Sequence, residues 1–244
     1  MERKNSTKIE IIDQTIISRK TQKVLAEEPW DIDPTKKELL KQNIQELLDL
    51  AQYAPYHYKI DEKYYAKAKS ELDSCVPWRF YVLDTEACRY LYFYIKNPAI
   101  KKDKIRDMLA AADALLMVTW LPHPPRENSQ DVTTERMFEP LPFDGNGMNM
   151  EHIAATSCAI QNILIGATAR NIPTYWSSGG KLRDKVARDY LGIPMNEILL
   201  GAIFLFPEDV EKRKATIIPG AKRNEGKEQS TWSTWLHLNE PANI

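Results

Sequence analysis

The segment from Ile172 to Asp184, IPTYWSSGGKLRD, places two serines and two glycines directly after an apolar, aromatic run. The apolar run is typical of a strand, and the basic residues after it are typical of the start of a helix. Because glycine has no Cβ, a ligand can lie against the bare main chain at Gly179 and Gly180. The structural alternative is that Ser178 is the N-cap of a helix that begins near Lys181.

A second segment, Ile17 to Leu25, reads ISRKTQKVL and places two cations beside a hydroxyl at Arg19, Lys20 and Thr21. Arginine offers a planar fork of donors to a phosphate, and lysine offers a point charge. The trio is therefore a candidate phosphate site. Taken alone, a cluster of this kind is more often a solvated basic patch.

Other common kinds of site have no support in the sequence. The four histidines are scattered, with no His-x-x-x-His and no acidic cluster at ligand spacing, which argues against zinc or non-haem iron. Gly179-Gly180-Lys181 lacks the upstream glycine of a phosphate loop, and there is no Gly-x-Gly-x-x-Gly. Neither serine of the SSGG segment lies in a Gly-x-Ser-x-Gly elbow, so no motif supports a hydrolase.

Helices and strands that alternate along the chain must position the two candidate segments. Apolar periodicity predicts helices over residues 6–20, 34–53, 61–72, 85–94, 99–111 and 149–170, and one of about ten residues from Lys181. Apolar runs predict strands over residues 79–83, 113–120, 172–176 and 199–206. The run at 113–120 is apolar throughout, so we expect a sheet covered by helices on both faces.

Two further stretches have no regular pattern. The connection from Leu121 to Met148 is rich in proline and glycine and longer than about 12 residues, which is unusual unless a loop is functional, and we interpret it as a lid. From about residue 210 to 244 the chain forms a polar arm that contains Trp232 and Trp235. Disordered tails are poor in aromatic residues, so we expect this arm to pack against a partner subunit.

The composition limits the class of protein. A chain of 244 residues with 43% hydrophobic residues can bury a sizeable core, and we expect a single domain over residues 1–244. With 33 Lys+Arg against 34 Asp+Glu, there is no electrostatic footprint for nucleic acid. No apolar window approaches the roughly 20 residues of a membrane span, and the N-terminus lacks a secretory signal. Three cysteines without a Cys-x-x-Cys pair suit a reducing compartment, so we expect a cytoplasmic protein that binds neither nucleic acid nor membrane.

Six short motifs, read in order, resemble the FMN-dependent nitroreductase family over about residues 15–215. They are Arg19-Lys20-Thr21, AQYAP from Ala51, PWRFYVL from Pro77, SCAIQNILIGATARNI from Ser157, YWSSGG from Tyr175 and GAIFLFPEDVEKRK from Gly201. The resemblance implies an α+β fold, a three-layer α/β/α sandwich that forms a homodimer through its long helices. It also implies that the C-terminal extension wraps over the dimer partner.

The resemblance further implies that FMN is bound at each of two subunit interfaces, with NADH or NADPH as co-substrate. Flavin N5 would carry hydride to a nitroaromatic, quinone or related acceptor in a ping-pong reaction, so no side chain is expected to be catalytic. The phosphate and ribityl chain would be bound by Arg19, Lys20 and Thr21, with a further cation from Lys212 or Arg213. The isoalloxazine would lie beside the main chain at Ser177, Ser178, Gly179 and Gly180.

One segment departs from the family pattern. In the family, Ala-Pro is usually followed within a few residues by Ser and by Asn-x-Gln-Pro-Trp, whose polar side chains meet the flavin. Here Pro55 leads into an inserted segment of about residues 56–74, and Ser74 and Val76 stand where Asn and Gln would be.

The insertion begins beside the expected flavin edge, where Pro55, Tyr56 and His57 could contact the cofactor or cover the substrate pocket. It leaves two alternatives open. One is specialised flavin chemistry on the same fold, such as flavin fragmentation or reductive dehalogenation. The other is a flavin-binding protein without turnover.

Overall fold

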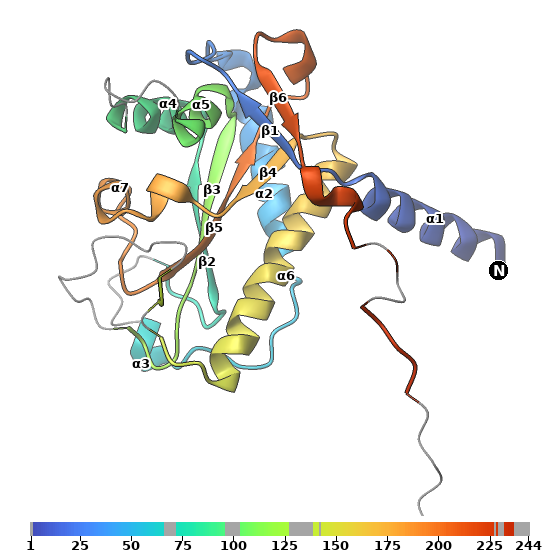
Figure 1. Cartoon of the computed structure of the whole chain (residues 1–244), viewed down its shortest axis with the longest axis vertical. Coiled ribbons are helices and arrows are strands. Elements are labelled where there is room, and N and C mark those ends of the chain that lie inside the picture. The colour runs from blue at the N-terminus through green and yellow to red at the C-terminus, as the bar shows by residue number, and fades with distance from the viewer. Residues whose placement is uncertain are drawn as a thin grey trace, which may run out of the picture.

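The computed structural model describes residues 2–65, 72–95, 103–126, 139–141, 143–226, 228 and 232–236. In this part of the chain, a four-stranded antiparallel sheet has the order β2-β3-β5-β4 (Figure 1). Its strands are β2 (Trp78–Leu83), β3 (Ala114–Trp120), β5 (Ile198–Leu205) and β4 (Thr174–Ser177). A separate two-stranded ribbon pairs β1 (Gln22–Leu25) with β6 (Thr216–Pro219).

Helices lie on both faces of the sheet, as the apolar run at 113–120 predicts. Alternate residues of β3 enter two different cores because successive side chains of a strand point to opposite faces. Leu115 and Met117 pack with α4 (Thr85–Tyr94) and α5 (Lys104–Ala111). Leu116 and Val118 pack with α2 (Lys37–Ala51) and α6 (Gly147–Ala169). All seven residues of β3 are buried, and the α+β fold class is confirmed.

The predicted elements are recovered closely where local periodicity is strong. Helix α4 has the predicted bounds, α6 replaces the predicted 149–170, and each of the four sheet strands lies within two residues of its prediction. The predicted helix at 6–20 is α1 (Glu2–Ser18), and the one at 34–53 is a 3-10 turn, η1 (Pro34–Lys36), followed by α2. The predicted helix at 61–72 begins with α3 (Glu62–Tyr65), and its residues 66–71 lie outside the described residues.

Two other predictions fall partly outside the described residues. The predicted helix at 99–111 is α5, whose expected first turn belongs to the undescribed stretch 96–102. The predicted lid from Leu121 to Met148 includes the undescribed residues 127–138 and 142. At its ends, His123 N donates to Asn149 Oδ1 at 2.7 Å, and Asn146 Nδ2 donates to the His123 carbonyl at 2.8 Å. These bonds hold the two ends of the connection together.

The expected ten-residue helix from Lys181 is wrong. The chain forms a 3-10 turn, η2 (Gly180–Arg183), and then the six-residue helix α7 (Lys185–Tyr190). Between them Asp184 has an extended backbone, with φ −66° and ψ 141°, which interrupts the helical hydrogen-bond ladder. Strands β1 and β6 were not predicted either, because each is only four residues long. Two further 3-10 turns are η3 (Val210–Lys212) and η4 (Ala221–Asn224).

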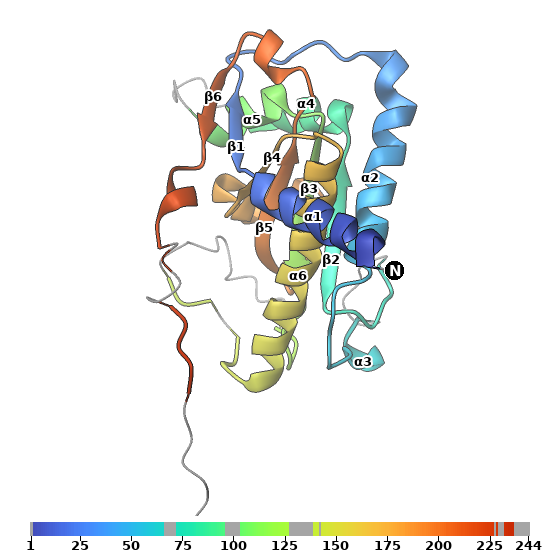
Figure 2. The same cartoon turned by 90° about the vertical axis from the view of Figure 1, so that its right-hand side faces the viewer.

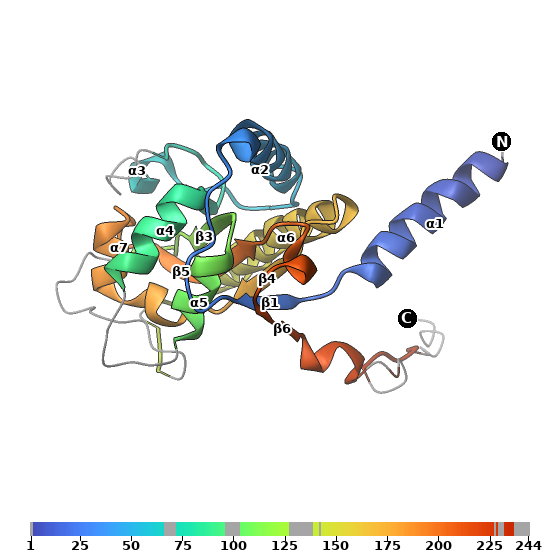
Figure 3. The same cartoon turned by 90° about the horizontal axis from the view of Figure 1, so that it is seen from above.

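The two ends of the chain extend away from the body. Figure 3 shows α1 and the C-terminal arm leaving the sheet on the same side, and Figure 2 shows α1 crossing in front of the molecule. Large apolar side chains of α1 are exposed, namely Ile9, Ile11, Ile12, Ile16 and Ile17. In the arm, Trp235 is 90% exposed. None of the helices formed by the described residues is long and apolar enough to span a bilayer.

Candidate functional site

The cationic trio lies where α1 ends and β1 begins. Thr21 forms a parallel bridge with Thr174, the first residue of β4, and its carbonyl accepts the Gly220 amide at 2.9 Å. Arg19 is half-buried, and Lys20 is exposed. Sequences far apart in the chain, the end of α1, the start of β4 and the end of β6, therefore meet at Thr21.

Strand β4 connects this junction to the Ser-Ser-Gly-Gly turn. It runs from Thr174, beside Thr21, to Ser177, where the turn begins. Three residues of strand at about 3.3 Å each separate the two points by about 10 Å. The two segments that the sequence singled out independently thus lie along a single edge of the sheet.

The turn itself needs glycine for the chain's own packing. Gly179 has φ +103° and Gly180 has φ +51°, in the region where a Cβ is disfavoured. A Cβ on Gly179 would also lie 2.8 Å from Leu199 Cδ2. The Gly179 amide donates to Ser177 Oγ at 3.2 Å, which closes the turn.

The predicted capping role of Ser178 is wrong. The N-cap of η2 is Gly179, and no side chain caps this turn. Ser178 is exposed, and its carbonyl accepts a hydrogen bond from Arg183 Nε at 2.6 Å. Its hydroxyl therefore faces the surface at the candidate site. The next cation along the chain, Lys181, is held 2.5 Å from Asp103 Oδ2.

The structure separates Lys212 and Arg213 from the trio within one chain. In the β1–β6 ribbon Leu25 pairs with Thr216 and Gln22 pairs with Pro219, so residues before 216 lie at the end of the ribbon that is remote from Thr21. The Arg213 guanidinium lies 4.9 Å from the Trp30 ring centroid, and its Nε donates to Asp209 Oδ1 at 3.0 Å.

The same register identifies a cation that the sequence interpretation missed. Lys222 follows Gly220 by two residues, and Gly220 is hydrogen-bonded to Thr21. Lys222 is exposed on η4, next to the junction that carries the trio. The sequence signal for this cation is the short apolar run Thr216 to Pro219, TIIP, which is followed closely by Lys222 and a second basic residue. The signal becomes informative only when this run is paired with Gln22 to Leu25 as a two-stranded ribbon.

Pro55, Tyr56 and His57 lie at the other edge of the sheet. The Tyr56 ring meets the Trp78 ring at the start of β2, with centroids 5.6 Å apart and planes at 89°. A hydrogen bond with Cys75 raises the pKa of the Tyr56 phenol. His57 Nδ1 lies 2.9 Å from Glu151 Oε2 of α6. Because β2 and β4 are opposite edges of the described sheet, one chain does not bring these residues to the glycine turn.

The segment in which the sequence departs from the family pattern is held by Arg79. This arginine is 3% exposed, and it donates to the carbonyls of Ser74 at 2.6 Å and Val76 at 2.7 Å. The segment is therefore locked to the start of β2 through its main chain. Among the described residues, no group of three or more His, Cys, Asp and Glu is placed to hold a metal ion.

Comparison with known families identifies the family of this chain. The model of the nitroreductase family matches residues 34–205, and the chain belongs to this family. A search of curated proteins found no match.

Among solved structures, similar chains come from several bacteria. A nitroreductase-like family protein from Bacillus cereus is 17% identical with a TM-score of 0.49, and the match covers 83% of this chain and 94% of that one. A nitroreductase family protein from Clostridium novyi NT is 18% identical with a TM-score of 0.46, and the match covers 81% of this chain and 87% of that one. A nitroreductase with bound FMN from Bacteroides fragilis is 20% identical with a TM-score of 0.42, and the match covers 80% of this chain and 87% of that one.

Proposed function

We propose that the protein is an FMN-dependent oxidoreductase that uses NADH or NADPH to reduce a nitroaromatic, quinone or related small organic acceptor. The observation that carries this proposal is the alignment of the trio Arg19 to Thr21 and the turn Ser177 to Gly180 along one sheet edge. Membership of the nitroreductase family supports it. FMN is the cofactor that the sequence resemblance implies.

The donor set at the Thr21 junction fits a phosphate monoester. Arg19 supplies a guanidinium that can form two parallel hydrogen bonds, Lys20 and Lys222 supply ammonium groups, and Thr21 supplies a hydroxyl donor. These are the groups that commonly bind phosphate. Lys20 and Lys222 are exposed and Arg19 is half-buried, so a phosphate can be reached from solvent. We propose these four residues as the phosphate site and leave Lys212 and Arg213 out of it.

Bound FMN would supply the hydride chemistry, and the chain would supply position and field. The main chain from Ser177 to Gly180 presents amide groups without bulky side chains, which lets a flat ring approach. Lys181 is engaged by Asp103, so we assign no side chain of this turn as an acid or a base. The protons of the reaction would come from water or from the acceptor.

We further propose that the protein is a homodimer. The five exposed isoleucines of α1 and the exposed Trp232 and Trp235 form apolar surface that a partner subunit would bury. Pro55, Tyr56 and His57 lie at the sheet edge opposite the glycine turn. A second copy could supply them to a cofactor held at the first copy's turn, and the site would then be complete only in the dimer.

Visible spectroscopy tests the function directly. We expect the purified or FMN-reconstituted protein to show bound flavin absorbance, and anaerobic NADH or NADPH to bleach it. A protein that stays colourless after reconstitution contradicts the proposal. Comparison of the two nucleotides by stopped-flow gives the preferred co-substrate.

The phosphate site is tested by two alanine variants and one control. Arg19→Ala and Lys222→Ala should each weaken FMN binding about ten- to a hundredfold, the usual range for a charge-assisted hydrogen bond. Lys212→Ala, an exposed cation at the other end of the ribbon, should leave it unchanged. Loss of affinity in Lys212→Ala with none in Lys222→Ala would reverse this assignment.

A flavin-binding protein without turnover is the second candidate. It is favoured by the segment at Ser74 and Val76, whose carbonyls are occupied by Arg79 and whose side chains replace the amide groups usual in the family. Flavin that binds but is not bleached by either nucleotide would select this alternative. Bleached flavin that fails to reduce nitroaromatics and quinones would instead point to specialised chemistry on the same fold.

A further inference from the structure

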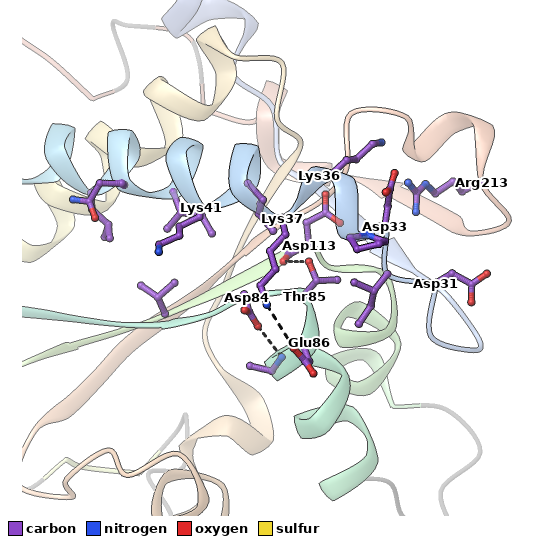
Figure 4. A pocket seen from close by; sticks show the side chains of 18 residues that line it. Asp31, Asp33, Lys36, Lys37, Lys41, Asp84, Thr85, Glu86, Asp113 and Arg213 are labelled. Carbon is purple, nitrogen blue, oxygen red and sulfur yellow. Dashed lines mark hydrogen bonds and ion pairs between the residues drawn. The ribbon is translucent and has the colours of Figure 1, made fainter.

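Figure 4 shows a second candidate site, a pocket of about 780 Å³. It is bordered by the segment 31–48, which contains most of α2, by the segment 82–87 at the end of β2 and the start of α4, and by Asp113 and Arg213. None of the four proposed phosphate ligands and none of the turn residues Ser177 to Gly180 lines it. Its function is therefore a separate question.

The walls of the pocket are apolar. Leu40, Ile44 and Leu48 of α2 face Val82 and Ala87 across it. Val82, near the end of β2, is 43% exposed, so its side chain can be reached by a ligand in the pocket. Nine charged residues also line the pocket; six of them are exposed, and Asp84, Asp113 and Arg213 are half-buried. A concave site that combines apolar wall with a few half-buried polar groups is typical of sites for small organic molecules.

Most charged groups of the pocket already have partners within the protein. The Asp84 carboxylate accepts the first-turn amide of α4 at 2.9 Å. Lys37 Nζ lies 3.9 Å from Glu86, as the dashed line in Figure 4 shows. Arg213 donates to Asp209 at 3.0 Å. These groups offer little unsatisfied charge to a ligand.

Among the half-buried charged residues that line the pocket, Asp113 is the exception. Its main chain is engaged, since its amide donates to the Leu205 carbonyl at 2.9 Å and its carbonyl accepts from Thr85 Oγ1 at 2.8 Å. Its half-buried carboxylate has no hydrogen bond and no ion pair with any described residue. Burial raises the pKa of this carboxyl, against the effect of Arg213, Arg89 and Lys36. A partly buried carboxylate without a donor is costly, and a donor on a ligand would offset the cost.

We propose that this pocket binds a small organic amine. Its apolar body would pack between α2 and Val82, and its ammonium group would donate to the Asp113 carboxylate. An acid would gain less, because the half-buried cation Arg213 is already paired with Asp209, and the lining lysines Lys36, Lys37 and Lys41 are exposed. Lys36, which is fully at the surface, opposes an amine only weakly because water and salt screen it.

Three probes that share one apolar body test the proposal on the full chain by calorimetry. They are 2-phenylethylamine, 2-phenylethanol and 3-phenylpropanoate. We expect the amine to bind about tenfold more tightly than the alcohol, because it adds a charge-assisted hydrogen bond. Equal or tighter binding of the alcohol or the carboxylate, or no saturable binding of the amine, would overturn the proposal.

Variants locate the site. Asp113→Asn should remove the preference for the amine over the alcohol, and Val82→Trp should block all three probes by filling the pocket. Asp31→Asn, at an exposed lining position, is the matched control and should bind as the parent does. FMN retention should be the same in all three variants, which separates this test from that of the cofactor site.

An NMR measurement on the unmodified protein covers the case in which a variant fails to fold. The amine should shift the methyl signals of Val82 and Ala87, both of which line the pocket. Shifts confined to other methyl groups would place the amine elsewhere and overturn the assignment.

Discussion

Asp113 and Glu197 are both buried to some degree, but they differ in whether their carboxylates accept hydrogen bonds. Burial raises the pKa of both groups. Glu197 is fully buried but accepts hydrogen bonds from Tyr81 Oη at 2.9 Å and from Thr119 Oγ1 at 2.5 Å. Asp113 has no comparable donor among the described residues. The two side chains should therefore respond oppositely to replacement by the neutral amide.

Asp113→Asn should raise the free energy of unfolding by about 1 kcal/mol at neutral pH, since it removes a partly buried charge that no described residue hydrogen-bonds and whose burial outweighs the nearby cations. The folded pKa of the aspartate is raised above its ordinary 3.8, so the folded state binds a proton more tightly than the unfolded state. The parent protein therefore loses stability as the pH rises from the ordinary pKa of 3.8 to the higher pKa of the folded state. Denaturation curves of parent and variant should coincide well below pH 3.8 and separate above it. A variant that is less stable at neutral pH would contradict this.

Glu197→Gln should lower the free energy of unfolding by about 3 kcal/mol, the range for breaking a buried charged network. Arg79 and Arg188 stabilise the Glu197 carboxylate electrostatically, and the amide would leave their charges uncompensated. Urea denaturation measures the change, with the exposed Glu208→Gln as the control. Equal stability of the two variants would show that the network contributes little.

At the scale of elements, the turn after β4 depends on a backbone conformation that ordinary residues avoid. Gly179→Ala should lower the free energy of unfolding by about 1–2 kcal/mol because φ at this position is +103°. The new Cβ would also lie 2.8 Å from Leu199 Cδ2, which should lower it further. Gly147→Ala is the matched control, since a Cβ there meets nothing within 4 Å. Thermal denaturation should separate the two, and a Gly179→Ala variant as stable as the control would show that the turn can relax.

The ribbon of β1 and β6 is the element that assembles the proposed phosphate site. It places Gly220 against Thr21, two residues before Lys222, while the same antiparallel register takes Arg213 to the remote end beside Trp30. A change of strand direction or register would exchange which basic pair meets the phosphate. The strand partner of a cation therefore predicts its distance from the proposed phosphate site better than its position in the sequence does.

At the scale of the whole molecule, α1 and the C-terminal arm extend away from the body and carry exposed apolar side chains (Figure 3). Truncation after Gly226 removes the tryptophans but keeps the β1–β6 ribbon and η4. We expect this variant to fold and to retain fewer dimers in sedimentation at low concentration, because it loses apolar interface. An unchanged dimer would show that the arm does not hold the partner. Truncation after Ala215 is a poorer test, since it also removes β6.

Much of the architecture is determined locally and can be predicted from the sequence. The bounds of α4, the burial of β3 on both faces and the length of α6 follow from periodicity and apolar content, which can be read from a short local stretch of sequence. The trio at Arg19 and the glycines at 179 and 180 were also evident, because unusual residue types mark them. The resemblance to the nitroreductase family, carried by short motifs in order, was confirmed by the family match.

The tertiary structure decided what depends on contacts between distant segments. Strands β1 and β6 are nearly 200 residues apart and only four residues long, so neither has a local signal strong enough to predict it. Their pairing selects Lys222, and the packing of α2 against β2 and α4 creates the pocket around Asp113. The sequence by itself determined the family and the strongly periodic elements, because hydrophobic periodicity is local. Only the fold decided which charges meet, because strand register and helix packing join residues that the chain keeps far apart.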